Sequence, residues 1–186
     1  MSEWLSIVWS SRSNWDREEN DFYPSPSHTI DDLLRFEEFY WLIREPACWD
    51  WAMSKRLGEL WKEVYSSDLI DRGYWEQKDF LNSNVDCKNI ITNPPYKLWQ
   101  EFIEKSLEIV KEKQWKVAML MKLVFLESTG RYSMFKNYPL KKVLVYSKRI
   151  TFTKNWVKIK WTGMIAYARF IWDWSYKWEP MIDWIK

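Results

Sequence analysis

Four consecutive residues, Asn93-Pro94-Pro95-Tyr96, are the part of this chain whose types and spacing are best suited to chemistry. The two prolines fix the backbone and remove two N–H donors, so the carbonyl oxygens of Asn93 and Pro94 are not taken up by a helix and stay available as acceptors. An amide oxygen and a fixed carbonyl oxygen can accept both hydrogens of an exocyclic NH2 group, and the ring of Tyr96 offers a surface on which a base can stack. The tetrapeptide is therefore typical of a site that methylates a planar amino group.

A short apolar run, Asn89-Ile90-Ile91-Thr92, precedes the tetrapeptide and is expected to form a buried parallel strand that ends at the prolines. Apolar residues recur on one helical face over 97–113, so this helix is expected to cover the sheet. Strand and helix patterns alternate, which predicts an α/β fold with a mostly parallel twisted sheet, helices on both faces and ligands at the carboxyl ends of the strands. The other expected helices are 28–38, 50–60 and 131–136, and the expected strands are 41–45, 62–67, 88–92, 116–122, 141–146 and 164–172, with a hairpin over 150–161.

With its surroundings, the tetrapeptide resembles the small phage-type DNA N6-adenine methyltransferases, which use S-adenosylmethionine. The resemblance follows the family's order over roughly residues 20–186, and a match of several motifs is far more specific than any one of them. It implies a single Rossmann-like methyltransferase domain with an antiparallel last strand. The other segments that carry it are Asp21-Phe22-Tyr23-Pro24-Ser25-Pro26 with Thr29, Glu45-Pro46-Ala47-Cys48-Trp49-Asp50-Trp51, Ser66-Ser67-Asp68-Leu69, Lys78-Asp79-Phe80, and Phe125-Leu126-Glu127-Ser128 with Arg131.

The resemblance implies S-adenosylmethionine as the cofactor and gives roles to residues of these segments. Glu45 would lie near the sulfonium and amino group of the cofactor, and Asp79 and Phe80 would meet its adenine. Asp68 ends a strand where acidic residues of doubly wound folds accept hydrogen bonds from ribose hydroxyls, although capping a helix N-terminus is the alternative. The expected cofactor-binding residues are Tyr23, Pro24, Thr29, Glu45, Pro46, Ala47, Cys48, Asp68, Leu69, Asp79, Phe80 and Asn93.

The catalytic residues are expected to be Asn93, Pro94, Pro95 and Tyr96. N6 of an adenine would attack the sulfonium methyl directly, aided by positioning and by hydrogen bonds to Asn93 and to the Pro94 carbonyl, without a general base, a metal or a covalent intermediate. Because a duplex hides N6 in its base pair, an adenine of double-stranded DNA would flip into the pocket and stack on Tyr96. Methylation of adenine in RNA, or of a glutamine side chain in a protein, is an alternative that the same tetrapeptide suits.

Tryptophan stands where the family normally has glycine, at Trp49 and Trp51, and an indole there would occupy the space that the cofactor needs. The chain has 16 Trp and only 4 Gly, whereas glycine makes up about 7% of average proteins. This indicates UGA codons translated as Trp in a gene whose host reads UGA as Gly. The alternative is that every Trp is real and that the protein binds nucleic acid without the cofactor. Trp172 and Trp184 are expected to be genuine, and the suspect positions are Trp4, Trp9, Trp15, Trp49, Trp51, Trp61, Trp75, Trp115, Trp156, Trp161, Trp174 and Trp178.

The C-terminal third is basic, because between Glu127 and Asp173 there is no acidic residue. The ten basic residues of this stretch are Arg131, Lys136, Lys141, Lys142, Lys148, Arg149, Lys154, Lys158, Lys160 and Arg169. Basic residues interleaved with aromatic ones suit phosphates and exposed bases, so region 125–162 is expected to contact nucleic acid and argues against a protein substrate. A solvated surface with core aromatics is the alternative. The residues expected to contact DNA are Arg131, Lys148, Arg149, Lys154 and Lys158.

Length and composition bound the remaining possibilities. The 186 residues fit one domain, expected over 21–186, after an acidic lead-in over 1–20 that is expected to be disordered. Neither a run of about 20 apolar residues nor a secretory signal is present, and Cys48 and Cys87 form no disulfide framework, which favours the cytoplasm. With one histidine and two separated cysteines, neither a metal site nor a cysteine nucleophile is expected.

Overall fold

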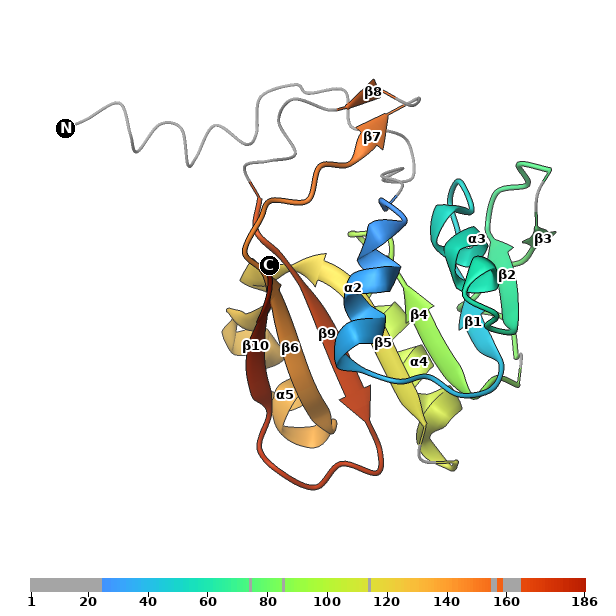
Figure 1. Ribbon diagram of the computed structural model, residues 1–186. Coiled ribbons are helices and arrows are strands. Elements are labelled where there is room, and N and C mark those ends of the chain that lie inside the picture. The colour runs from blue at the N-terminus through green and yellow to red at the C-terminus, as the bar shows by residue number, and fades with distance from the viewer. Residues whose placement is uncertain (1–24, 74, 85, 114, 155–156, 159–164) are drawn as a thin grey trace.

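The computed structural model describes residues 25–73, 75–84, 86–113, 115–154, 157–158 and 165–186. The expected lead-in over 1–20 lies outside the described residues, as do Tyr23 and Pro24 of the expected cofactor-binding set. The described chain forms an eight-stranded sheet with helices on both faces, and a separate two-stranded hairpin (Figure 1). The predicted α/β fold is confirmed.

The sheet has the strand order β10-β6-β9-β5-β4-β1-β2-β3. Neighbouring strands pair in parallel except at β9, which is antiparallel to both of its neighbours, β5 and β6. The strand predicted over 164–172 as the antiparallel last strand is β9, but β10 follows it in the chain and pairs in parallel with β6. The strands of the sheet are β1 (Ile43–Glu45), β2 (Val64–Asp68), β3 (Glu76–Gln77), β4 (Asn89–Thr92), β5 (Lys116–Lys122), β6 (Leu140–Tyr146), β9 (Tyr167–Asp173) and β10 (Met181–Ile185).

Helices cover both faces of this sheet, as Figure 1 shows: α2 and α3 lie on the near face, and α4 and α5 lie on the far face. The helices are α2 (His28–Phe36), α3 (Ala52–Glu59), α4 (Trp99–Lys111) and α5 (Tyr132–Asn137), with the short 3₁₀ helices η3 (Leu123–Leu126) and η4 (Thr129–Arg131). The hairpin of β7 (Thr153–Lys154) and β8 (Val157–Lys158) extends from the end of the sheet at which the parallel strands finish.

The central strand β5 explains why the sheet needs two layers of helices. Val117 and Met119 belong to the hydrophobic cluster that packs against α4, whereas Ala118 and Leu120 belong to the cluster that contains the apolar side chains of α2 and α3. All four side chains are fully buried. Because successive side chains of a strand point to opposite faces, a continuous apolar run is what a strand covered on both faces requires.

The predicted elements occur within three residues of their expected bounds, and strand 116–122 matches in full. Two strands were not predicted. β3 has only two residues, and β10 is an edge strand on which four of the five residues are exposed, so its sequence lacks the apolar run of a buried strand. The predicted hairpin over 150–161 is present as β7 and β8, although its turn at 155–156 lies outside the described residues.

Candidate active site

The carboxyl end of β4 holds the Asn-Pro-Pro-Tyr motif. β4 is fully buried between β1 and β5, and Asn93 and Pro94 are buried after it, while Tyr96 is half-buried. The Tyr96 hydroxyl lies 3.0 Å from the hydroxyl of Tyr167 on β9, and the Lys122 Nζ atom lies 4.4 Å from the centroid of the Tyr96 ring. The sheet thus holds the motif in place, and contacts from β5 and β9 orient the tyrosine ring.

Glu45 ends β1, the strand next to β4, and its carboxyl group is fully buried. One oxygen, Oε2, accepts a hydrogen bond from the Ser54 hydroxyl of α3. The other, Oε1, has no hydrogen-bond partner among the described residues. Burial away from water raises the pKa of Glu45 to about 8, despite the hydrogen bond from Ser54 and the positive charge of Arg169, which lower it. Burial therefore favours the protonated form of Glu45, and its Oε1 remains open to a ligand as far as the described residues go.

Backbone hydrogen bonds fix the loop between β1 and α3. Cys48 N–H donates to the Ser67 carbonyl over 3.2 Å, and Trp51 N–H donates to the Cys48 carbonyl over 2.6 Å. The Trp49 indole is buried, with 6% of its surface exposed, and its Nε1 donates to the Asn93 carbonyl over 2.9 Å. This bond joins the β1 loop to the catalytic motif, so the carbonyl that the sequence singled out as an open acceptor is occupied by Trp49.

Asp68 lies at the end of β2 with both carboxylate oxygens bonded to the backbone. Its Oδ2 accepts from Trp49 N–H over 3.0 Å, and its Oδ1 accepts from Ile70 N–H over 3.1 Å. Burial raises its pKa, although these two hydrogen bonds favour the charged form. In this structure Asp68 therefore joins the β1 loop to the turn after β2.

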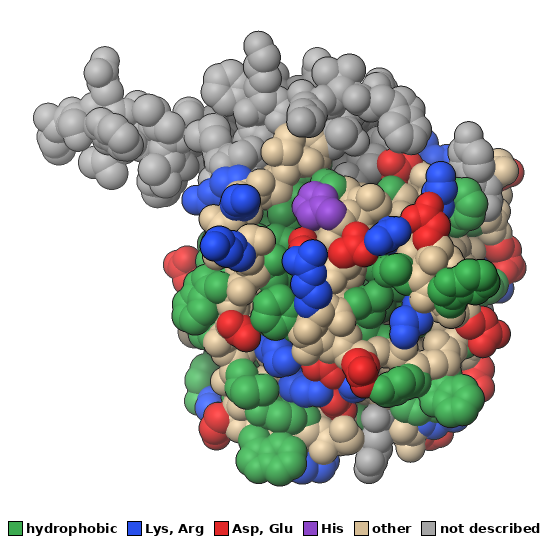
Figure 2. Space-filling model, in the orientation of Figure 1, with side chains coloured by type: hydrophobic (Ala, Val, Ile, Leu, Met, Phe, Trp, Pro, Cys, Tyr) green, Lys and Arg blue, Asp and Glu red, His purple; other side chains and the backbone are tan. Residues whose placement is uncertain are grey.

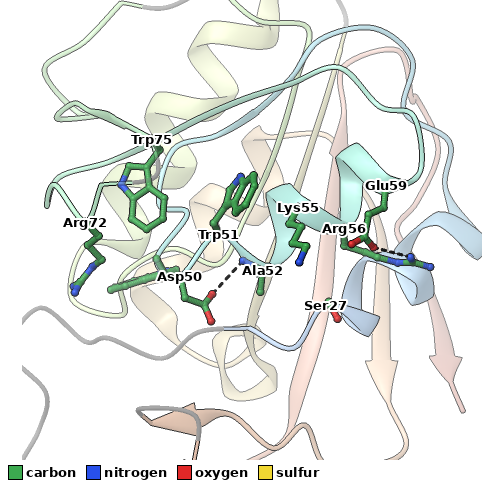
Figure 3. Close-up of a pocket in the computed structure, with 10 residues that line it drawn as sticks. Ser27, Asp50, Trp51, Ala52, Lys55, Arg56, Glu59, Arg72 and Trp75 are labelled. Atoms are coloured by element: carbon green, nitrogen blue, oxygen red, sulfur yellow. Dashed lines mark hydrogen bonds and ion pairs between the residues drawn. The ribbon is translucent and has the colours of Figure 1, made fainter.

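An open cavity of about 540 Å³ lies between the β1 loop, the start of α3 and the loop after β2 (Figure 3). Trp51 and Trp75 line it together with Trp49, and the charged side chains of Lys55 and Arg72 face the same space. Asp50 also lines the cavity and accepts a hydrogen bond from Ala52 N–H over 3.2 Å. A cavity at the carboxyl ends of β1 and β2 is where open α/β sheets bind their ligands.

The remaining expected cofactor-binding residues lie in the β1 loop, at the start of α2, just after β2, and between β3 and β4. Pro46, Ala47 and Cys48 are buried in the β1 loop, and burial raises the pKa of the Cys48 thiol far above its usual range, which makes it a poor nucleophile. Thr29 is buried at the start of α2, where its hydroxyl donates to the Pro26 carbonyl over 2.8 Å. Leu69 is 56% exposed just after β2.

Asp79 and Phe80 lie between β3 and β4. Phe80 is buried, with its ring 4.8 Å from the ring of Phe102 and its face 4.8 Å from the guanidinium of Arg44. Asp79 is exposed, and its carboxylate accepts from Leu81 N–H over 2.9 Å and from the Asn82 side chain over 2.7 Å. The pair thus forms a turn with one residue anchored in the core.

Sequence reasoning missed three residues that contact the site. Tyr167 and Lys122 orient Tyr96, as described above. Arg169 is fully buried in β9, where its Nη2 donates to the Thr29 carbonyl over 3.2 Å, and its Nε and Nη1 have no hydrogen-bond partner within the part of the chain described. The signal that could have found it is a charged residue inside a strand whose seven positions are all buried, since a buried charge is rare unless it has a partner.

Much of the predicted basic face is engaged within the protein. Lys141 and Lys142 contact Glu37, at 2.8 and 3.7 Å, and Arg169 is buried. Arg131 donates to the backbone carbonyl of Phe125 over 2.8 Å, which orders the segment after β5. Two aromatic residues of this region, Tyr146 and Phe152, are buried, so they belong to the core as the alternative expected.

Three basic residues of region 125–162 whose side chains are described are exposed: Lys136 in α5, and Lys148 and Arg149 after β6. Lys148 and Arg149 are exposed just after β6, and Figure 2 shows basic side chains gathered in that part of the view, whereas acidic and basic side chains mix over α2 and α3. Lys154 and Lys158 lie in β7 and β8, the hairpin at the same end.

Within the described residues no group of three or more His, Cys, Asp or Glu side chains could hold a metal ion. Also within these residues, none of the helices combines the length and apolar character needed to cross a membrane.

Comparisons with known proteins place the fold. No family model matches the chain. No curated protein matches it in sequence. Among solved structures, it is similar to the methyltransferase subunit of a type I restriction-modification system from Streptococcus thermophilus, with a TM-score of 0.58 and 10% identity over 81% of this chain and 44% of that one.

Two further structures agree. The 23S rRNA methyltransferase ErmE gives a TM-score of 0.55 with 14% identity over 81% of this chain and 69% of that one. A TehB-like S-adenosylmethionine-dependent methyltransferase from Corynebacterium glutamicum gives a TM-score of 0.51 with 9% identity, and the match covers 91% of this chain and 92% of that one. The chain spans less than half of the restriction-modification subunit but nearly all of the TehB-like protein. It has the Rossmann-like fold of S-adenosylmethionine-dependent methyltransferases.

Proposed function

We propose that this protein is an S-adenosylmethionine-dependent methyltransferase that acts on the N6 amino group of adenine in DNA, as the small phage-type enzymes do. The observation that carries the proposal is the position of Asn93-Pro94-Pro95-Tyr96 at the carboxyl end of β4, beside the β1 loop, in a sheet of methyltransferase topology. These are the strand ends at which a doubly wound sheet binds a ligand. The motif supplies the acceptors and the flat ring that a flipped adenine requires.

The cofactor is expected at the end of β1, where Glu45 and the adjacent loop meet α3. The unsatisfied Oε1 of Glu45 suits the amino group of the methionine part, and a positive ligand there would favour the ionised carboxylate over the protonated one. Bound there, the cofactor supplies the methyl group. The residues of this chain position the acceptor nitrogen: the Asn93 side chain and the Pro94 carbonyl accept its hydrogens while Tyr96 stacks on the base.

DNA is the preferred substrate because the sequence resembles enzymes that act on it, and because Lys148 and Arg149 are exposed at the end of the sheet that holds the motif. Lys154 and Lys158, in the hairpin at that end, extend the same set of basic residues. Adenine in RNA is the second candidate, since the motif handles the same amino group in either polymer and the fold also resembles that of an rRNA methyltransferase.

The test is transfer of labelled methyl groups from S-adenosylmethionine to a random-sequence DNA duplex, to the single strand and to an RNA of the same sequence, followed by nucleoside analysis. The protein is assayed as written and with glycine at positions 49 and 51. We expect N6-methyladenine from the duplex. Asn93→Ala and Tyr96→Ala should lower transfer at least 100-fold while the thermal unfolding midpoint (Tm) stays within a few degrees. Label in RNA alone would move the assignment to RNA, and undiminished transfer by either variant would remove the assigned site.

A further inference from the structure

Four non-glycine residues among those described adopt the left-handed backbone region, and all four are tryptophan: Trp41, Trp49, Trp51 and Trp61, with φ of 70°, 53°, 68° and 59°. This region brings the Cβ atom of an L-residue too close to the carbonyl oxygen, so glycine adopts it routinely and a bulky side chain is a genuine outlier there. Asn and Asp, the residues that tolerate it next best, are common in this chain. The fact that, among the described non-glycine residues, only tryptophans adopt the left-handed conformation therefore needs a specific cause.

The backbone around Trp61 identifies the motif to which this residue belongs. α3 ends at Glu59, and after it Trp61 N–H donates to the Gly58 carbonyl over 3.0 Å, while Lys62 N–H donates to the Leu57 carbonyl, also over 3.0 Å. These two bonds define the Schellman motif, whose left-handed position is usually glycine. The Trp61 side chain is 96% exposed, so it gains nothing from packing that could offset the strain.

Trp49 and Trp51 show the same backbone at the candidate site. Trp51 precedes α3 with φ 68° and ψ 6°, and Trp49, two residues earlier, has a φ of 53°. The buried Trp49 indole bonds to the Asn93 carbonyl, so it fills the space between the ends of β1 and β4. A glycine at 49 would open this space toward the cavity, because the indole is itself part of the cavity wall.

We infer that positions 41, 49, 51 and 61 are glycine positions of the functional protein, and that the Trp49 indole in the chain as written blocks the cofactor-binding crevice. Position 41 was not suspected from the sequence. The assignment of glycine to these four positions rests on their φ angles alone, whereas the blocked crevice rests on the proposed function. UGA codons that the source organism reads as glycine account for both. The codons at the four positions give a direct test, since UGA would support the inference and UGG would overturn it.

The assignment of glycine is tested by Trp61→Gly, with Trp184→Gly as the matched control. Trp184 is 61% exposed, but it lies in β10 and does not have a positive φ. We expect Trp61→Gly to raise Tm by about 2–4 °C, since it relieves left-handed strain in a chain of this length, and Trp184→Gly to leave Tm unchanged or lower it. A fall in Tm for Trp61→Gly as large as that for the control would overturn the assignment of glycine.

The blocked crevice is tested by titrating S-adenosylmethionine into Trp49→Gly, Trp49→Phe and Trp61→Gly in a calorimeter, with circular dichroism to confirm folding. We expect Trp49→Gly to bind at least tenfold more tightly than the chain as written. Trp49→Phe keeps a ring in the crevice, and Trp61→Gly changes a remote turn, so both should bind as the chain as written does. Equal affinity in Trp49→Gly would overturn the blockade. If Trp61→Gly were stabilised and no variant bound the cofactor, the glycine positions would stand while the proposed function failed.

Discussion

Replacing Glu45 by glutamine gives a direct measurement of how the buried end of β1 is charged. Burial raises the pKa of Glu45 from its ordinary 4.5 to about 8. In the unfolded chain the carboxyl is ionised above pH 4.5, while the folded protein keeps the proton until about pH 8, so folding takes up a proton across this window. Stability contributed by this group is complete below pH 4.5 and is lost as the pH rises toward 8, at about 1.4 kcal/mol per pH unit.

Between pH 6 and pH 8 the wild-type protein should therefore lose about 2 kcal/mol of unfolding free energy relative to Glu45→Gln. Glutamine keeps the size and the acceptor for the Ser54 hydroxyl but does not titrate, so ionisable groups that do not interact with Glu45, such as Asp68, cancel in the difference. The assay is urea unfolding of both proteins at pH 6, 7 and 8. A difference that stays constant over this range would refute the reasoning, because it would mean that Arg169 keeps Glu45 ionised throughout.

Two further changes probe buried charges, one at the end of α2 and one in β9. Glu37→Gln should cost about 2 kcal/mol of unfolding free energy at pH 7, because hydrogen bonds from Lys116 and Lys141 outweigh burial and hold the pKa of Glu37 below its usual value. In urea unfolding this difference should shrink as the pH falls below the ordinary value of 4.5, and a loss that did not change with pH would contradict it. Arg169→Met should alter stability at pH 6 by less than about 1.5 kcal/mol, since the buried Nε and Nη1 atoms of Arg169 have no hydrogen-bond partner among the described residues, and such a guanidinium stabilises poorly. A loss above about 4 kcal/mol by the same method would show that its contacts are stronger than those described.

The part of the fold that follows from local pattern could be predicted. The apolar run of β5 and the proline stop after β4 mark buried strands by composition alone, and the helix between them shows its apolar face at helical spacing. β10 lacked such a signal, because an edge strand with exposed side chains is stabilised by pairing with β6 rather than by burial. Local pattern predicts strands that the core requires, and it misses those that only extend a sheet.

How the candidate residues come together in space could be predicted only in part. The ends of β1 and β4 meet because neighbouring parallel strands finish at one edge of the sheet, so Glu45 and Asn93 could be placed together from the sequence. The contacts made by Tyr167 and Arg169 could not, because they come from β9, which enters the sheet antiparallel beside β5. Long-range strand order, rather than any motif, decides which side chains complete the site.

The main-chain hydrogen bonds of the β1 loop do not depend on which side chains residues 49 and 51 carry. Its conformation is held by main-chain atoms: Cys48 N–H bonds to β2, Trp49 N–H bonds to Asp68, and Trp51 N–H closes the turn. Glycine can make each of these hydrogen bonds and adopts a positive φ without strain. The loop is therefore expected to keep its shape in Trp49→Gly, because its surroundings impose a backbone that tryptophan disfavours. What the substitution removes is the indole between the ends of β1 and β4, which we infer blocks the cofactor-binding crevice.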